Sequence, residues 1–491
     1  MKTFLLLLAL AVPAIAADTL ERKAPPPLTQ ERRVEEPKTV RLPGPLPLDV
    51  TTDNERPYVR LVIVLGAAGE AAQPPALGGI ADLTAALVQE GAVVLDRNGR
   101  ERTLDSKAYA EALDELGASV SIVTGGDAAY VTVGALKNTL SETVALVAAA
   151  IRRPTLDAPG FERLKRQTLL ALRQQSTNPE NAASLQARRR VYGEQAYGTV
   201  ATPASVGRIT LGDARAFHAA SFGPTSISAV GVIDMAALKQ LVEEHFLKGP
   251  GLAVGDIAQA QNFTRVPTPD ARAAAREGDI DLINLPGSEQ SFVLVVQAGL
   301  EREHEDYDTL RVLNMILGGV HESRLESIIR EEKGWAYFAR SAVPALKRGG
   351  RIALESPIRA EATAQALQTM LAQLELLRTA DVGAAELAAA KTRLLSGIDD
   401  IFENNESIAS RRANEAVIGL PADAIARERT QIAAVTVADV RRIAGRYLRP
   451  DACAVIIAGD KQVVLPQLQT VRPARAVNVI EPDGVKPRSA D

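Results

Sequence analysis

The feature that most constrains this chain is an internal repeat whose two copies stand 226 positions apart (436 − 210 = 226). A Thr-x-x-Asp-x-Arg pattern at residues 210–215 returns at residues 436–441. The same offset relates further identical pairs: Lys165 and Lys391, Asn178 and Asn404, Glu180 and Glu406, Gly193 and Gly419, Pro224 and Pro450, and Asp234 and Asp460. A fixed period without gaps reflects a repeated unit of structure, so the chain is expected to contain two copies of one domain.

The two copies show the same order of predicted elements. In the first copy, hydrophobic periodicity predicts strands over 118–123, 129–134 and 226–232 and long helices over 140–151 and 159–174. In the second copy it predicts strands over 292–297, 351–357 and 452–458 and long helices over 361–378 and 384–401. Each Thr-x-x-Asp marks a helix start, because the threonine hydroxyl can accept a hydrogen bond from the amide three residues on. The fold class is therefore predicted to be α+β.

The ends of the chain differ in composition from the two copies. Lys2, an apolar run and a small-x-small pattern at 14–16 predict a signal peptide over residues 1–17, and hence an exported protein, periplasmic or secreted. Residues 18–38 are charged and proline-rich, which predicts a disordered leader. The predicted domains span 39–248 and 278–470, with a linker over 249–277 between them and a tail over 471–491.

The composition limits the chemistry that this chain can perform. Four histidines and one cysteine exclude a disulfide framework and a cysteine-rich zinc site. A net charge of −4 provides no electrostatic basis for binding nucleic acid. A near-continuous aliphatic run at 58–65 predicts a strand buried on both faces. The basic run at 188–190 lies on a predicted helix and is expected to be a solvated face.

The most distinctive motif lies at residues 318–337, which read GGVHESRLESIIREEKGWAY. The apolar spacing at 325–329 predicts a short amphipathic helix that ends at Gly334. Arg324 is then placed near the start of this helix, and Tyr337 is placed just beyond its end in a strand-like run. The spacing alone is compatible with a solvated arginine and an edge-strand tyrosine.

The pattern SRL, followed several residues later by REEKGxxY, resembles the C-terminal-domain signature of the pitrilysin/insulinase-type zinc peptidases, the inverzincins that include mitochondrial processing peptidase. The similarity extends from about residue 39 to residue 460. It implies that each domain has the mitochondrial-processing-peptidase-like (LuxS/MPP-like metallohydrolase) fold, a mainly antiparallel sheet covered by helices. It also implies that the matching residues, Arg324 and Tyr337, bind the substrate peptide opposite the zinc ion.

In this family one helix carries the inverted zinc motif H-x-x-E-H, and a later helix carries a glutamate ligand. Here the motif positions are occupied by Asp82, Ala85 and Ala86. The later position falls on Ala171, or on Leu170 if the alignment shifts by one residue. Methyl groups cannot coordinate zinc, and one carboxylate cannot replace two imidazoles. The sequence therefore predicts a degenerate zinc motif and no metal bound by this chain.

Three functional hypotheses follow from this resemblance. In the favoured one, the chain has no catalytic residues of its own and is the zinc-free pseudopeptidase subunit of an exported heterodimeric zinc metalloendopeptidase. A homologous zinc-bearing subunit supplies the metal, this chain supplies Arg324 and Tyr337, and peptides or unfolded polypeptides are the substrates. The second is an inactive scaffold or peptide-binding protein, because core subunits of mitochondrial respiratory complex III resemble the same family. The third, a stand-alone peptidase, requires a metal site, and His321 is an isolated histidine beside two glycines.

Overall fold

The structure, a computed structural model, describes residues 38–42, 44–53, 57–95, 98–193, 196–248, 251–253, 279–471 and 475–480. The predicted signal peptide, nearly all of the predicted leader and most of the predicted linker lie outside the described residues. Both copies of the repeat belong to one compact unit of the chain. Across the described ranges, every helix is too short or too polar to serve as a membrane span.

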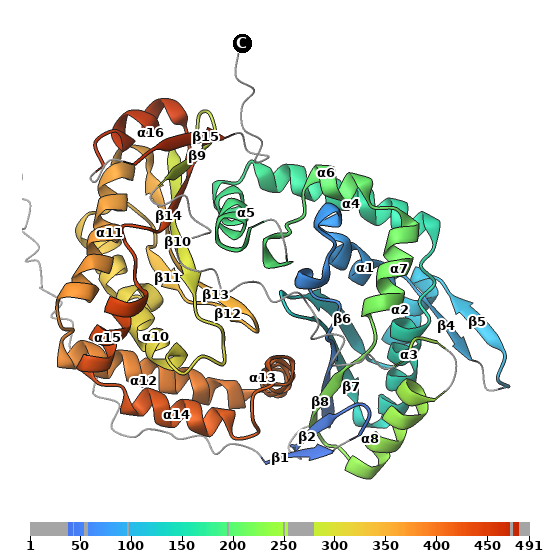
Figure 1. The fold of residues 1–491 in the computed structure, drawn as a ribbon. Coiled ribbons are helices and arrows are strands. Elements are labelled where there is room, and N and C mark those ends of the chain that lie inside the picture. Colours follow the sequence, from blue (N-terminus) through green and yellow to red (C-terminus); the bar gives the residue numbers. More distant parts are fainter. Residues whose placement is uncertain are drawn as a thin grey trace, which may run out of the picture. The chain divides into compact units, whose positions relative to one another are not determined.

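Each half of the chain contains one main sheet, and the two sheets share one plan (Figure 1). The first is ordered β1-β2-β8-β3-β7-β6 and the second β15-β9-β14-β10-β13-β11, with β12 also paired to β13. Neighbouring strands are antiparallel except toward one edge, where β2 runs parallel to β8 and β9 runs parallel to β14 and β15. The prediction of two mainly antiparallel α+β domains is confirmed.

The strands of the first half are β1 (Thr39–Leu42), β2 (Leu48–Thr52), β3 (Tyr58–Leu65), β6 (Ser119–Thr124), β7 (Ala129–Leu136) and β8 (Ser226–Gly231), with β4 (Ala92–Leu95) and β5 (Glu101–Leu104) as a separate pair. Those of the second half are β9 (Ile280–Asn284), β10 (Gln290–Gly299), β11 (Arg340–Ala342), β12 (Ala345–Leu346), β13 (Gly349–Arg359), β14 (Ala454–Gly459) and β15 (Val477–Ile480).

The predicted long helices are present with small shifts at their ends. The first half contains α1 (Ile80–Val88), α2 (Ser106–Glu115), α3 (Leu140–Arg152), α4 (Ala158–Ser176), α5 (Pro179–Tyr192), α6 (Pro203–Arg208), α7 (Leu211–Ser221) and α8 (Met235–Val242). The second contains α10 (Tyr307–Asn314), α11 (Thr363–Thr379), α12 (Ala384–Asp400), α13 (Asn405–Ile418), α14 (Ala424–Ala434), α15 (Val437–Tyr447) and α16 (Lys461–Leu468). The helix predicted within 318–337 is a π-helix, Glu326–Glu332.

The repeat is preserved in the tertiary contacts of the two halves. The repeated threonines cap α7 and α15, and in each cap the aspartate three residues on accepts from the threonine amide in return. The Lys165 ammonium donates to the carbonyl oxygen of Ile209 at 2.6 Å, and its repeat equivalent Lys391 donates to the carbonyl oxygen of Val435 at 3.0 Å. A lysine that ties a long helix to the start of the capped helix is thus present in both copies.

One helix of each copy packs on the sheet of the other copy. Helix α5 of the first half lies against β10 and β14, and the equivalent helix α13 of the second half lies against β3 and β8. Their N-caps, Asn178 and Asn404, are members of the repeat and accept from backbone amides in the same way. Ala183 of α5 and its repeat equivalent Ala409 of α13 are completely buried in these contacts. The two halves therefore exchange helices: each half packs one of its helices on the sheet of the other half.

This exchange accounts for the burial of β3 on both faces, which the sequence predicts. Leu61 and Ile63 belong to the core of the first half. Val62 and Val64 point to the other face and pack with buried residues of α13. Because α13 comes from the second half, β3 is buried on its second face only when both halves are folded.

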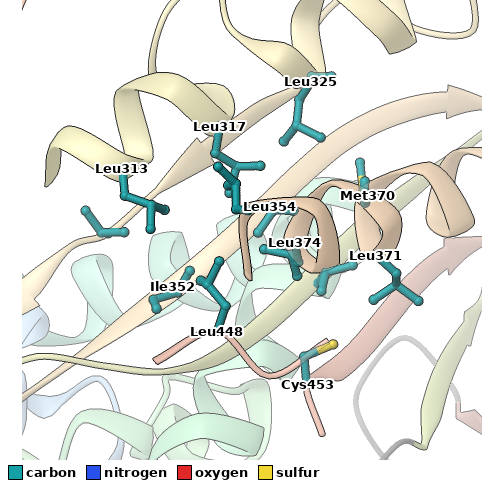
Figure 2. Packing of buried hydrophobic residues seen from close by; sticks show 14 of the residues in the cluster. Leu313, Leu317, Leu325, Ile352, Leu354, Met370, Leu371, Leu374, Leu448 and Cys453 are labelled. Carbon is teal, nitrogen blue, oxygen red and sulfur yellow. The ribbon is translucent and has the colours of Figure 1, made fainter. Parts of the chain in front are cut away.

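The core of the second half packs α11 against β10 and β13 (Figure 1). Buried side chains from both layers meet there, with Leu354 of β13 close to Leu374 of α11 (Figure 2). Cys453, the single cysteine of the chain, is completely buried in the same cluster. Burial raises the pKa of its thiol, which suits a packing role for this side chain.

The sequence predicts an irregular tail over residues 471–491, but residues 477–480 form strand β15. Strand β15 pairs in parallel with β9, so the second domain continues beyond its predicted end at 470. The chain just before this strand is fixed by Arg475, whose guanidinium donates hydrogen bonds to the carbonyl oxygens of Pro450 at 2.6 Å and Cys453 at 3.0 Å. A four-residue strand among prolines and arginines carries too short a pattern to be recognised in the sequence.

Candidate functional site

Helix α1 occupies the position of the expected metal-binding helix. It follows Gly79, whose φ of 96° lies in the left-handed region that glycine adopts without strain. The side-chain oxygen of Gln73 caps its start by accepting from the amides of Gly79 at 2.7 Å and Ala81 at 3.2 Å. Asp82 is an exposed residue of α1. The protein around its carboxyl group nevertheless displaces enough water to raise its pKa, and the Glu70 carboxylate raises it further.

The side chains at the family's ligand positions do not fit a zinc ion. Ala85 is buried in the core of the first half, and Ala86 is half-buried next to it. Ala171 is exposed on α4, as is the alternative position, Leu170. Within the described ranges, no group of three or more His, Cys, Asp or Glu side chains could hold a metal ion. Since Asp82 is one donor where three protein ligands are needed, no catalytic step through zinc can be assigned to these residues.

Helix α5 connects the α1 region to the segment that carries Tyr337. The Arg188 guanidinium donates to both carboxylate oxygens of Glu70, at 3.2 and 2.6 Å. Eight residues earlier, Glu180 accepts from Arg340 at 3.1 Å, three residues beyond Tyr337. Eight residues of α-helix rise about 12 Å, so the two regions lie at opposite ends of one helix. The prediction that the basic run at 188–190 is a solvated face is wrong, because the side chains of Arg188 and Arg190 are only 22% and 15% exposed.

Arg324 forms a closed ion pair with Glu386. Its Nε and Nη2 donate to the two carboxylate oxygens at 2.7 and 2.8 Å. These hydrogen bonds hold the pKa of the Glu386 carboxyl below its usual range. Because Glu386 lies in the first turn of α12, the pair ties the start of the 324–334 segment to that helix. Two donors of the guanidinium are therefore already occupied within the protein.

Tyr337 is 81% exposed and lies just before β11, not within the strand that the sequence predicts. The cation beside its ring is Arg330, whose guanidinium carbon is 5.7 Å from the ring centroid. This distance is within the range of a cation–π contact. The structure thus places Tyr337 with Arg330, whereas Arg324 engages Glu386.

A buried carboxylate lies beside the Arg330–Tyr337 contact. The Glu326 side chain is 4% exposed, and its oxygens accept from Nη1 of Arg330 at 2.6 Å and from the Ala339 amide at 2.7 Å. Burial alone would raise the pKa of Glu326, but hydrogen bonds from Ala339 and Arg330 outweigh it and keep the pKa below its usual range. The imidazole of His321 lies 3.3 Å from the same carboxylate. His321 therefore neighbours this ion pair.

Sequence reasoning missed Glu326 and Arg330 as members of the site. Their spacing of four residues is a known signal for a helical ion pair, so their pairing could have been anticipated. The burial of Glu326 could not, because it depends on the chain folding back so that the Ala339 amide reaches the carboxylate.

Comparisons with known proteins point to one family. Residues 208–394 match the family described as Peptidase M16 inactive domain. The crystal structure of a peptidase M16 inactive domain from Pseudomonas fluorescens is similar with a TM-score of 0.73 and 26% identity, covering 87% of this chain and 98% of that chain. The family that these findings support is that of the pitrilysin-like peptidases. The resemblance inferred from the motifs is thereby confirmed.

Two further comparisons show a similar sequence and a similar fold. An uncharacterised zinc protease of Mycobacterium tuberculosis is 25% identical over 370 residues, which cover 74% of this chain and 82% of that protein. A chain in the structure of complex III from Candida albicans has a TM-score of 0.68 at 14% identity, covering 88% of this chain and 99% of that chain. The second likeness concerns the fold alone.

Proposed function

We propose that this chain is the zinc-free subunit of an exported heterodimeric zinc peptidase. In this proposal a homologous subunit with an intact H-x-x-E-H motif supplies the metal and the general base. This chain supplies part of the surface that binds a peptide or an unfolded polypeptide. The observation that carries the proposal is a contrast between the regions that α5 connects. The ligand positions of α1 and α4 hold the Asp82 carboxylate and otherwise only methyl groups, whereas Tyr337 remains exposed with a guanidinium beside its ring.

The geometry favours Arg330 over Arg324 as the cation that acts with Tyr337. A phenol and a guanidinium can both donate hydrogen bonds to the carbonyl oxygens of a bound peptide. Arg324 uses two donors on Glu386, so its loss should mainly affect the attachment of its helix to α12. Arg330 is 38% exposed and stands next to the exposed ring, so it can reach a ligand there.

The edge of the first sheet supports a peptide as the ligand. Strand β6 is the last strand in the order of that sheet, and the described strand paired with it is β7. Its alternate residues are exposed, and Val123 is 61% exposed. Helix α1 packs beside this strand. An extended peptide can add to such an edge as a further strand, because the backbone groups along the outer side are available for pairing.

The test uses the complex isolated with its zinc-bearing partner and assayed with a fluorogenic peptide. Arg330→Ala should lower kcat/KM roughly ten- to hundredfold, the range for losing a charge-assisted hydrogen bond, and Tyr337→Phe should lower it less. Zinc content and assembly should not change. Arg427→Ala is the matched control, because Arg427 is an exposed arginine of α14. If both Arg330→Ala and Tyr337→Ala leave cleavage intact, the substrate-binding role is disproved.

The second candidate is an inactive scaffold, which the fold-level likeness to the complex III chain favours. A scaffold would copurify with its partners and yield an assembly that cleaves no peptide. Export, which the proposal also assumes, is tested by fractionating cells and locating the chain with an antibody. Recovery of the unprocessed chain in the cytoplasm would contradict it.

A further inference from the structure

We infer that Glu326 is a positioning residue for the Tyr337 site: its buried carboxylate holds Arg330 beside the Tyr337 ring and fixes the segment that carries this tyrosine. The inference rests on the proposed peptide-binding role of Tyr337. The two oxygens of the carboxylate serve different elements. One accepts from Arg330, four residues later on the same helix, and the other accepts from the amide of Ala339, two residues beyond Tyr337.

The segment around Tyr337 is fastened on both sides. Before the tyrosine, the Trp335 amide donates to the carbonyl oxygen of Ile329 at 3.0 Å, and the Trp335 carbonyl accepts from the Arg359 amide at 3.0 Å. After it, the Ala339 amide donates to Glu326 at 2.7 Å. Tyr337 thus stands at an exposed position between two fixed points, which limits the conformational freedom that binding a ligand would otherwise remove.

The negative charge of Glu326 decides where Arg330 points. The last turn of the same helix also carries Glu331, whose carboxylate acts on this guanidinium and could attract it away from Tyr337. Glu326 prevails because it is buried and a charge-assisted hydrogen bond is stronger away from water. Glutamine at this position would keep an acceptor for the Ala339 amide but would lose the charge that holds Arg330.

The first measurement is binding of a fluorescein-labelled protein kept unfolded by reduction and carboxymethylation, followed by anisotropy. Glu326→Gln and Arg330→Gln should each weaken binding about tenfold, and the double variant should weaken it no further, because one acts through the other. Glu386→Gln is the matched control: it releases Arg324 in the same way and should leave the affinity unchanged. Wild-type affinity in Glu326→Gln, or additive losses in the double variant, would overturn the inference.

The second measurement does not depend on peptide binding. Trp335 is the only tryptophan of the chain, so its emission reports on this segment. Glu326→Ala should shift the emission to longer wavelength and increase quenching by acrylamide, whereas Glu326→Gln should resemble the wild type because the Ala339 amide keeps an acceptor. Unchanged emission in Glu326→Ala would show that the carboxylate does not fix the segment. If the wild type binds no polypeptide but Trp335 responds as expected, the proposed function fails while the positioning role stands.

Discussion

Replacing Glu428 by glutamine should destabilise the second half of the protein strongly at neutral pH. Glu428 is 1% exposed on α14 and receives hydrogen bonds from Arg302 at 2.9 Å and Arg411 at 2.5 Å, with Arg311 as a third partner. Burial opposes its ionisation, but Arg311 and Arg411 outweigh it and lower the pKa from an ordinary 4.5 to about 2. At about 1.4 kcal/mol per pH unit, this difference corresponds to about 3 kcal/mol of stability.

The pH dependence of this contribution has a defined sign. Because the pKa of Glu428 is lowered in the folded protein, its contribution is present in full above the ordinary pKa of 4.5 and is lost as the pH falls toward 2. Glu428→Gln removes the charge at every pH and leaves three guanidinium groups without this counterion. The free energy of unfolding should therefore fall by about 3 kcal/mol at pH 7, and the difference from the wild type should shrink as the solution is acidified.

The assay is urea denaturation followed by circular dichroism at about pH 7 and about pH 3.5, which bracket the ordinary pKa of a glutamate. Asp423→Asn is the matched control, because Asp423 precedes the same helix, is exposed and pairs with an exposed arginine. That variant should change the free energy of unfolding by less than about 0.5 kcal/mol. Equal destabilisation by the two variants, or a Glu428→Gln effect that does not depend on pH, would refute the reasoning.

Three further predictions concern the metal, the linker and the exchanged helices. The purified chain should hold no stoichiometric zinc by metal analysis; one equivalent removable by chelator would contradict this. Limited proteolysis should cut first within 249–277, yet the two fragments should remain together on size exclusion because each half holds a helix of the other. Ala183→Leu and Ala409→Leu should each lower the free energy of unfolding, measured by urea denaturation, by about 1–3 kcal/mol through overpacking. An unchanged free energy of unfolding would show that these helices do not pack against the other half's sheet.

The sequence by itself determined the two-domain plan and the loss of the metal site. The repeat is visible because N-caps, turn glycines and apolar periods are local signals that survive in both copies. The strand at 58–65 could be predicted to be buried on both faces from its composition alone. The absence of ligands follows from residue type, since an alanine at positions 85, 86 and 171 cannot coordinate zinc in any fold.

Only the tertiary structure decided which charged side chains meet. Arg324 and Arg330 lie six residues apart in the same motif. Arg324 nevertheless forms its ion pair with Glu386, 62 residues away, whereas Arg330 contacts Glu326 and the ring of Tyr337. The packing of α5 and α13 on the sheet of the other half could not be predicted either. An amphipathic pattern shows that a helix buries one face, but it does not show which sheet that face packs against. Burial on a distant sheet and pairing of distant charges depend on the path of the whole chain, which no local pattern encodes.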